Sequence, residues 1–234
     1  MFRLARPLLL PALLAACAPA VMPNNATPRT AEVLPAATDT SPVGEGVTVS
    51  RWMLDPKGQP ASWLNTTLAG RGLREPINII LIDERAATPE EAAARLLDAA
   101  TRAGYGPKGG HSTGYSGVIN GERYAQQPAG NGEAFSDAPW WGSNNHGRVF
   151  GPARTARGFV WIASFSREDF ALFARMHHPY NSFRVARDDF ARRMTDTSDF
   201  KAAGSVDLGN ALNTPTLTTD DHDGQAVLLV APGH

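Results

Sequence analysis

The pattern of apolar and polar positions predicts a strand followed by a helix near the middle of the chain. Residues 77–82 form a nearly continuous β-branched run, which is typical of a strand covered on both faces. Thr88 can then cap a helix, Pro89 suits its first position, and Glu91 completes a capping box. Apolar residues recur at helical spacing up to Gly104, which suits a helix end. We therefore predict a strand–helix unit in this region.

The same pattern predicts a hairpin, a second helix and a last strand in the C-terminal half. Two β-rich runs at 147–150 and 159–165 are separated by a short polar link, as in an antiparallel hairpin. A helix follows, with these apolar residues on one face: Phe183, Ala186, Phe190 and Met194. A final strand lies at 226–230. The order strand, helix, strand, strand, helix, strand predicts an α/β (α+β) layered sandwich with a split βαβ, ferredoxin-like arrangement.

A Gly-, Ser- and Asn-rich stretch between residues 106 and 143 interrupts this pattern. We interpret it as a long insertion with one hairpin, which is uncommon in a compact domain unless it serves a function. Its aromatic side chains make Tyr115, Trp140 and Trp141 candidates for ligand binding. The tryptophan pair has two interpretations, an exposed binding patch or side chains tucked under the loop.

The first 45 residues differ in composition from the rest of the chain. Arg3 and Arg6 precede an apolar run at 8–14, as in a secretory signal. This run is shorter than the roughly 20 residues that span a bilayer. Residues 18–45 are rich in Ala, Pro and Thr and have few large apolar side chains, which favours a flexible tether. The predicted organisation is a signal peptide at 1–16, a tether at 17–45 and one domain at 46–234.

Cys17 is the only cysteine in the chain, and it directly follows Leu14, Ala15 and Ala16. This arrangement resembles the lipobox of bacterial lipoproteins, which implies that Cys17 is acylated and anchors the mature chain in the cell envelope, facing the periplasm. Ala18 is not aspartate, which favours the outer membrane over the inner one. The bilayer is then the first predicted partner and an envelope protein the second. The alternative is a chance thiol in a discarded signal peptide. A single cysteine excludes internal disulfides.

The adjacent histidines His177 and His178 are the most conspicuous polar pair. Such a pair can bind a metal, or act as a base with its orienting partner. Arg167 and Asp188 are the charged residues that could share a cleft with them. A third metal ligand would have to come from Asp169 or Asp188, so we predict neither a metal centre nor another cofactor. The alternative is a loop in which one histidine hydrogen-bonds the backbone.

Two further polar motifs are interpreted as turns. Residues 221–224 resemble the start of a calcium loop, but no downstream glutamate completes it. Residues 144–147 are typical turn residues, so we expect His146 to be exposed in a loop. The net charge of −1 gives no indication of nucleic-acid binding.

Several short motifs of the second half occur in a distinctive order. They are residues 147–150, residues 160–164 with Arg167, residues 177–178, residues 187–188 and residues 223–227. Together they resemble the LssY C-terminal domain family over about residues 75–231. The resemblance implies an α/β domain of the envelope, in a family often attached to membrane proteins. This chain departs from the family at Pro179, which follows the histidine pair, and at Ala186, where the family has glutamate.

The lipid anchor and the absence of a complete catalytic motif favour a membrane-tethered envelope lipoprotein with a non-catalytic binding or accessory domain. Its contact surface would be the aromatic-rich stretch at 106–141. The alternative is an envelope hydrolase. In that hypothesis Arg167 would hold an anionic group, and His177 or His178 would act as base beside Asp188.

Overall fold

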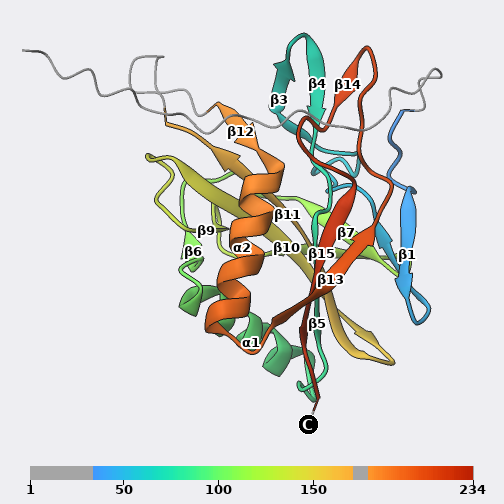
Figure 1. The fold of residues 1–234 in the computed structure, drawn as a ribbon, viewed down its shortest axis with the longest axis vertical. Coiled ribbons are helices and arrows are strands. Elements are labelled where there is room, and N and C mark those ends of the chain that lie inside the picture. Colours follow the sequence, from blue (N-terminus) through green and yellow to red (C-terminus); the bar gives the residue numbers. More distant parts are fainter. Residues whose placement is uncertain (1–33, 171–178, 234) are drawn as a thin grey trace, which may run out of the picture.

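The computed structural model describes residues 34–170 and 179–233, and this part of the chain is mainly β-structure (Figure 1). Strands make up 45% of the structure, and the two α-helices make up 15%. Cys17, His177 and His178 lie outside the described residues. None of the helices in the described ranges is long and apolar enough to cross a membrane.

The elements follow one another in this order: β1 (Thr40–Gly44), β2 (Val47–Ser50), β3 (Ser62–Leu68), β4 (Arg71–Arg74), β5 (Ile79–Asp83), α1 (Pro89–Arg102), β6 (Pro107–Lys108), β7 (Ser116–Ile119), β8 (Glu122–Gln127), β9 (Ala134–Ser136), β10 (Asn144–Thr155), β11 (Gly158–Glu168), β12 (Tyr180–Ser182), α2 (Phe183–Thr197), β13 (Lys201–Asp207), β14 (Leu217–Thr218) and β15 (Gln225–Ala231).

One large sheet of twelve strands forms most of the molecule. Nine of its strands follow the order β1-β2-β7-β8-β10-β11-β5-β15-β13, and β6, β9 and β12 attach beside this path. The sheet curls into a nearly closed, barrel-like form. A separate three-stranded sheet, β14-β4-β3, projects at one end of the molecule (Figure 1).

The predicted ferredoxin-like α/β sandwich is therefore wrong. The predicted strands do form neighbours in the order β10-β11-β5-β15, with β15 parallel to β5. However, the stretch predicted as an insertion contributes β7, β8 and β9 to the same sheet. Gly117 on β7 shows why: a Cβ there would lie 2.9 Å from side-chain atoms of Phe150 and Ile162. A glycine permits this close approach, and it leaves no apolar side chain for a sequence pattern to detect.

The first helix begins where the sequence predicts. The Thr88 hydroxyl accepts a hydrogen bond from the Glu91 backbone N–H at 3.2 Å, and Glu91 accepts one from the Ala87 N–H at 2.8 Å. Ser182 caps α2 by accepting from the Val185 N–H at 2.8 Å. The predicted apolar face of α2 is fully buried. The Thr88 contact confirms the predicted cap, whereas the Glu91 side chain reaches the N–H of Ala87, one residue before the N-cap, instead of that of Thr88.

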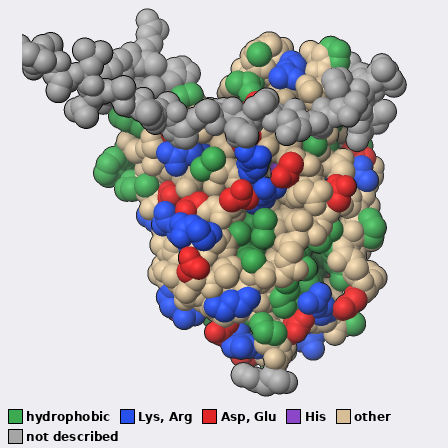
Figure 2. All heavy atoms as spheres, viewed as in Figure 1, with side chains coloured by type: hydrophobic (Ala, Val, Ile, Leu, Met, Phe, Trp, Pro, Cys, Tyr) green, Lys and Arg blue, Asp and Glu red, His purple; other side chains and the backbone are tan. Residues whose placement is uncertain are grey.

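Two hydrophobic cores lie on opposite faces of the sheet. Alternate residues of β5 enter different cores: Ile79 and Leu81 contact the core under α1 and α2, whereas Ile80 and Ile82 contact the core on the other face. This confirms the prediction of a strand covered on both sides. Figure 2 shows basic and acidic side chains interspersed over the visible face, without a broad patch of one sign.

Candidate metal centre

A stripe of polar side chains runs along one end of the β10–β11 hairpin. In the antiparallel register Asn144 lies opposite Glu168, His146 opposite Ser166, and Arg148 opposite Ser164. Alternate residues of a strand share a face, and directly opposed residues of two strands do too. All six side chains therefore point to one side of the hairpin, and all six residues are buried.

Two of these side chains meet a third from a distant loop. His111 follows β6, and its backbone N–H donates to the Gly132 carbonyl at 2.8 Å. Its ring stacks on that of His146, with the centroids 4.7 Å apart. One ligand atom each from His111, His146 and Glu168 lies within 4.8 Å of the other two. Two imidazoles and a carboxylate so close together form a possible metal-binding set.

Asn144 fixes the protonation of His146. The Asn144 side-chain N–H groups donate to the Gly142 carbonyl at 3.0 Å and to Glu168 Oε1 at 2.9 Å. The amide oxygen must then face His146 Nδ1, which is 3.0 Å away. Because this oxygen can only accept, Nδ1 carries the proton, and the neutral ring has its lone pair on Nε2. Hydrogen bonds of this kind orient metal-binding histidines.

The cluster lies in a cavity of about 120 Å³. The residues lining the cavity are Trp63, Leu64, Glu75, Gly110, His111, Ser112, Trp140, His146, Arg148 and Glu168. Trp63 is buried and its indole N–H donates to Ser166 Oγ at 3.3 Å. Gly110 allows close contact with Trp140, because a Cβ at this glycine would lie 2.2 Å from the indole ring.

Glu75 is a second carboxyl group in this cavity. It lies between β4 and β5, where its N–H donates to the Ala61 carbonyl and its own carbonyl accepts from the Met53 N–H. The residue is only 3% exposed. Burial raises its pKa to about 7, although the positive charge of Arg148 opposes this shift. A carboxyl group in this range can give or take a proton near neutral pH.

Arg148 links the cavity to the loop that carries His111. Its guanidinium donates to the Ser112 carbonyl and hydroxyl, each at 3.1 Å. It also lies over the Tyr115 ring, 5.1 Å from the centroid. The residue is 4% exposed. Among the described residues no carboxylate forms an ion pair with it.

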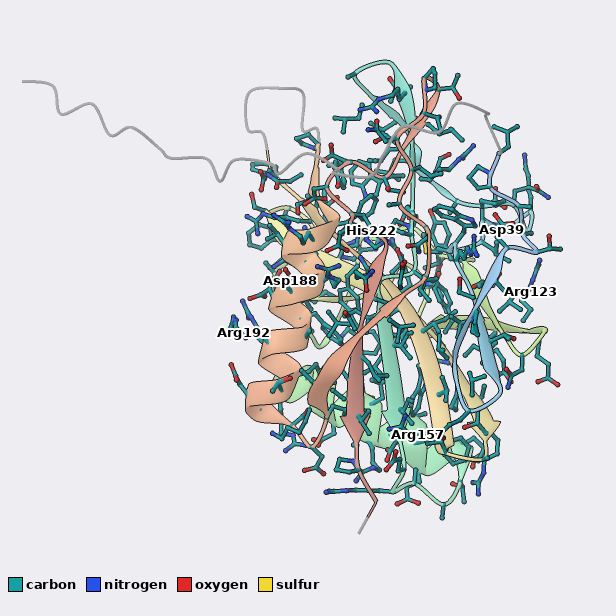
Figure 3. All side chains as sticks on the ribbon, turned by 45° about the vertical axis from the view of Figure 1, so that its right-hand side comes forward. Asp39, Arg123, Arg157, Asp188, Arg192 and His222 are labelled. Atoms are coloured by element: carbon teal, nitrogen blue, oxygen red, sulfur yellow. The ribbon has the colours of Figure 1, made fainter. Side chains whose placement is uncertain are left out.

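The two charged residues predicted to share a cleft have different partners in the structure. Arg167 forms an ion pair with Asp169 at 3.2 Å and pairs in register with Asn145, on the face of β11 opposite to Glu168. Asp188 lies on α2 (Figure 3), where it accepts from Arg187 Nε at 2.8 Å. In residues 34–170 and 179–233, no hydrogen bond or ion pair joins Arg167 to Asp188.

The three predicted binding residues have different positions. Trp140 lines the cavity and is 39% exposed, whereas Trp141 is 61% exposed. Tyr115 lies under Arg148, and its hydroxyl is 3.1 Å from Ser112 Oγ. Trp140 thus contributes directly to the cavity, and Tyr115 supports a residue that does.

The motif at residues 221–224 precedes β15 as a turn, as predicted. Asp221 accepts hydrogen bonds from the Tyr180 hydroxyl at 3.0 Å and from the Phe183 N–H at 2.9 Å, at the start of α2. Asp223 forms an ion pair with Arg187 at 2.6 Å. These contacts attach the loop before β15 to α2, which gives the acidic motif a structural role.

His222 (Figure 3) is fully buried within the same motif. The side-chain amide of Asn210 donates to the carbonyls of Arg51 and Ile77, so its oxygen faces His222 Nε2 at 2.7 Å. This oxygen accepts the Nε2 proton. Burial and, secondarily, the charge of Arg187 lower the pKa of His222 to about 3. The histidine is therefore neutral at physiological pH.

The sequence interpretation missed the residues of the cluster. His146 was expected to be exposed in a turn, but it is 3% exposed within β10. The useful signal was the period-2 spacing of Asn144, His146 and Arg148, which places polar side chains on one face of a strand. No local pattern connects them with His111 or Glu75, because those residues reach the cavity only through the tertiary fold.

Comparisons with protein-family models, with curated proteins and with solved structures find no match.

Proposed function

We propose that this domain is a metal-dependent hydrolase whose metal ion is bound by His111, His146 and Glu168. The observation that carries the proposal is the 4.8 Å cluster of their ligand atoms. Ligands around one tetrahedral zinc ion are about 3.3 Å apart, given metal–ligand bonds of about 2 Å. On metal binding, the distance between any two of the three ligand atoms would therefore shorten by about 1.5 Å at most. Rotation of the side chains can produce this change.

The donor set favours zinc with a catalytic rather than a purely structural role. Structural zinc sites use four protein ligands, whereas catalytic sites use three and leave a position for water. Here the three candidate ligands line a cavity instead of being enclosed by a fourth protein ligand among the described residues. The hydrogen bond from His146 to Asn144 supplies the orienting contact that such ligands need.

Glu75 supports hydrolysis as the reaction. A zinc ion lowers the pKa of bound water to about 7. Glu75 lines the same cavity, so its carboxylate would be placed to take a proton from that water. A metal ion held by the three ligands would thus supply an activated water as the nucleophile for a carbonyl group. Glu75 is the general base in this proposal.

The sequence also allowed a hydrolase, but with His177, His178, Arg167 and Asp188 as its site residues. A non-catalytic domain was favoured because no catalytic motif could be read along the chain. The metal cluster instead combines a loop and two strands. Its chemistry supports catalysis over simple binding.

The proposed location is the bacterial envelope, most consistent with the outer membrane. It is supported by Cys17 in its lipobox-like setting, with the bilayer as the first partner and an envelope protein as a further one. We also propose, from the order of its motifs, that the domain is related to the LssY C-terminal domain family. Its motifs at 147–150 and 160–164 fall on β10 and β11, which carry part of the cluster.

Metal analysis of the purified full-length chain in detergent tests the proposal. We expect about one zinc ion per chain after dialysis against zinc and removal of excess metal. His146→Ala and Glu168→Ala should each weaken zinc binding at least a hundredfold, with the fold retained by circular dichroism. Glu90→Gln, at an exposed position on α1, is the matched control and should bind zinc like the wild type. Zinc binding that survives both substitutions would overturn the proposal.

A further inference from the structure

We infer that the substrate of this site carries a carboxylate, which Arg148 binds beside the carbonyl group to be hydrolysed. The inference rests on the proposed metal centre and names the class of substrate for it. The compound it describes has a carboxylate one residue away from the scissile bond, as at the C-terminal end of a peptide.

The first support is a buried guanidinium group without a direct ion-pair partner. Arg148 is 4% exposed, and no carboxylate among the described residues forms an ion pair with it. Its Nε–H is also buried without a hydrogen-bond partner in this part of the chain. Buried charges are normally paired, because leaving water otherwise costs several kcal/mol per ion. An anionic substrate group would complete this site.

The second support is that Arg148 is held ready for a ligand. Ser112 accepts two of its hydrogen bonds, and the Tyr115 ring lies against the guanidinium. These contacts fix the side chain while leaving it on the cavity lining. A guanidinium that is already oriented binds a carboxylate with little further loss of freedom.

Glu75 does not remove the need for an anion. The two side chains line one cavity, but they are not within ion-pair distance. Within the described part of the cavity, Arg148 therefore has no ion-pair partner.

The spacing along β10 sets the kind of substrate. His146 and Arg148 are two residues apart on one face of the strand, a separation of about 6.7 Å at 3.3–3.4 Å per residue. A metal ion at His146 and an anion at Arg148 thus lie at neighbouring positions on one face of the strand, so the carboxylate of a substrate bound there would be a few bonds from its carbonyl group. The indole groups of Trp63 and Trp140 line the same cavity.

The reaction that follows is the hydrolysis of an amide or ester. A metal ion held by His111, His146 and Glu168 would activate a water molecule whose oxygen bonds to the carbonyl carbon, and Glu75 would take the proton that this water loses. The bond from this carbon to the leaving nitrogen or oxygen then breaks. Glu75 returns the proton to the leaving group, whose own carboxylate remains on Arg148. Water is the only co-reactant.

Hydroxamates that bind the metal test the inference without knowledge of the natural substrate. The full-length chain in detergent is loaded with cobalt(II), and binding is followed by the change in its visible spectrum. Succinic monohydroxamate places a carboxylate three bonds from the metal-binding carbonyl carbon, as in a C-terminal residue. Its methyl ester is the neutral control. We expect the acid to bind at least tenfold more tightly.

Arg148→Gln should abolish the preference for the acid while cobalt remains bound, and Arg148→Lys should retain part of it. Equal binding of acid and ester to the wild-type chain, with the cobalt spectrum intact, would overturn this inference alone. So would a preference that survives in a folded Arg148→Gln chain. If the wild-type chain binds no cobalt, both the proposed metal centre and this inference are wrong. The wild-type comparison remains decisive even if the Gln variant does not fold.

Discussion

Asn144 accepts a hydrogen bond from His146 Nδ1 across 3.0 Å, and this contact sets which nitrogen of the histidine can bind a metal. The same amide group donates to Glu168 Oε1 at 2.9 Å. One uncharged side chain thus orients two of the three candidate ligands. Because Asn144, His146 and Glu168 lie on paired strands, the arrangement is held by the sheet itself.

Asn144→Ala should weaken zinc binding about 10- to 100-fold, because the imidazole and the carboxylate both lose the partner that orients them. Competition with a zinc-binding dye measures this change. Asn131→Ala, at an exposed asparagine, is the control. A folded Asn144→Ala chain with the zinc affinity of the wild type would show that the hydrogen bonds do not orient the ligands.

Glu75→Gln should change how the stability of the metal-free chain depends on pH. Burial raises the Glu75 pKa from 4.5 to about 7, so between these values the folded chain holds a proton that the unfolded chain has lost. The wild-type chain therefore loses stability as pH rises through this window, by up to about 3 kcal/mol. Glutamine removes this contribution, and the variant should gain relative to the wild type as pH rises.

Urea unfolding in the presence of a chelator, at about pH 5 and about pH 8, measures the effect. Glu90→Gln removes a carboxyl from an exposed position and should follow the wild type. An identical pH dependence in Glu75→Gln and wild type would contradict the burial of a protonated carboxyl. In the zinc-loaded chain, the same substitution should leave the metal bound and abolish hydrolysis.

His222 should destabilise the fold in acid. Its pKa is lowered from 6.5 to about 3 in the folded chain. Between these two pH values the histidine is protonated in the unfolded chain and neutral in the folded chain. Stability is therefore lost as pH falls from 6.5 towards 3. His222→Gln keeps a side-chain N–H for the Asn210 oxygen but does not titrate. Its stability should decrease less than that of the wild type between about pH 7 and about pH 5, measured by urea unfolding.

This effect has the opposite sign to that of Glu75, so single variants are needed to separate the two. A His222→Gln chain that loses as much stability in acid as the wild type would show that the buried histidine does not cause the loss of stability at low pH.

Cys17→Ser should release the protein from membranes. The serine hydroxyl cannot replace the thiol as the acylated group, and the remaining apolar run at 8–14 is too short to span a bilayer. Fractionation of cells and labelling with a fatty-acid analogue measure both consequences. Continued recovery of the unlabelled variant with the membranes would count against a lipid anchor.

Features that depend on neighbouring residues could be predicted from the sequence. The Thr88 cap, the apolar face of α2 and the doubly covered strand β5 all arise from contacts or periodicities within a few residues. The extent of the sheet could not be predicted in the same way. β7 can pack closely against the barrel because Gly117 has no side chain. A search for periodic apolar side chains cannot detect such a position.

The sequence by itself determined the capped first helix, the apolar face of the second, the central strands and the unusual setting of Cys17, because each depends on local spacing. Only the tertiary structure decided the fold class and brought His111, Glu75 and Glu168 to one cavity. Strand pairing joins residues that are far apart in the chain, and its register selects which side chains share a face. The metal-binding potential therefore lies in the register of β10 and β11, not in any contiguous motif.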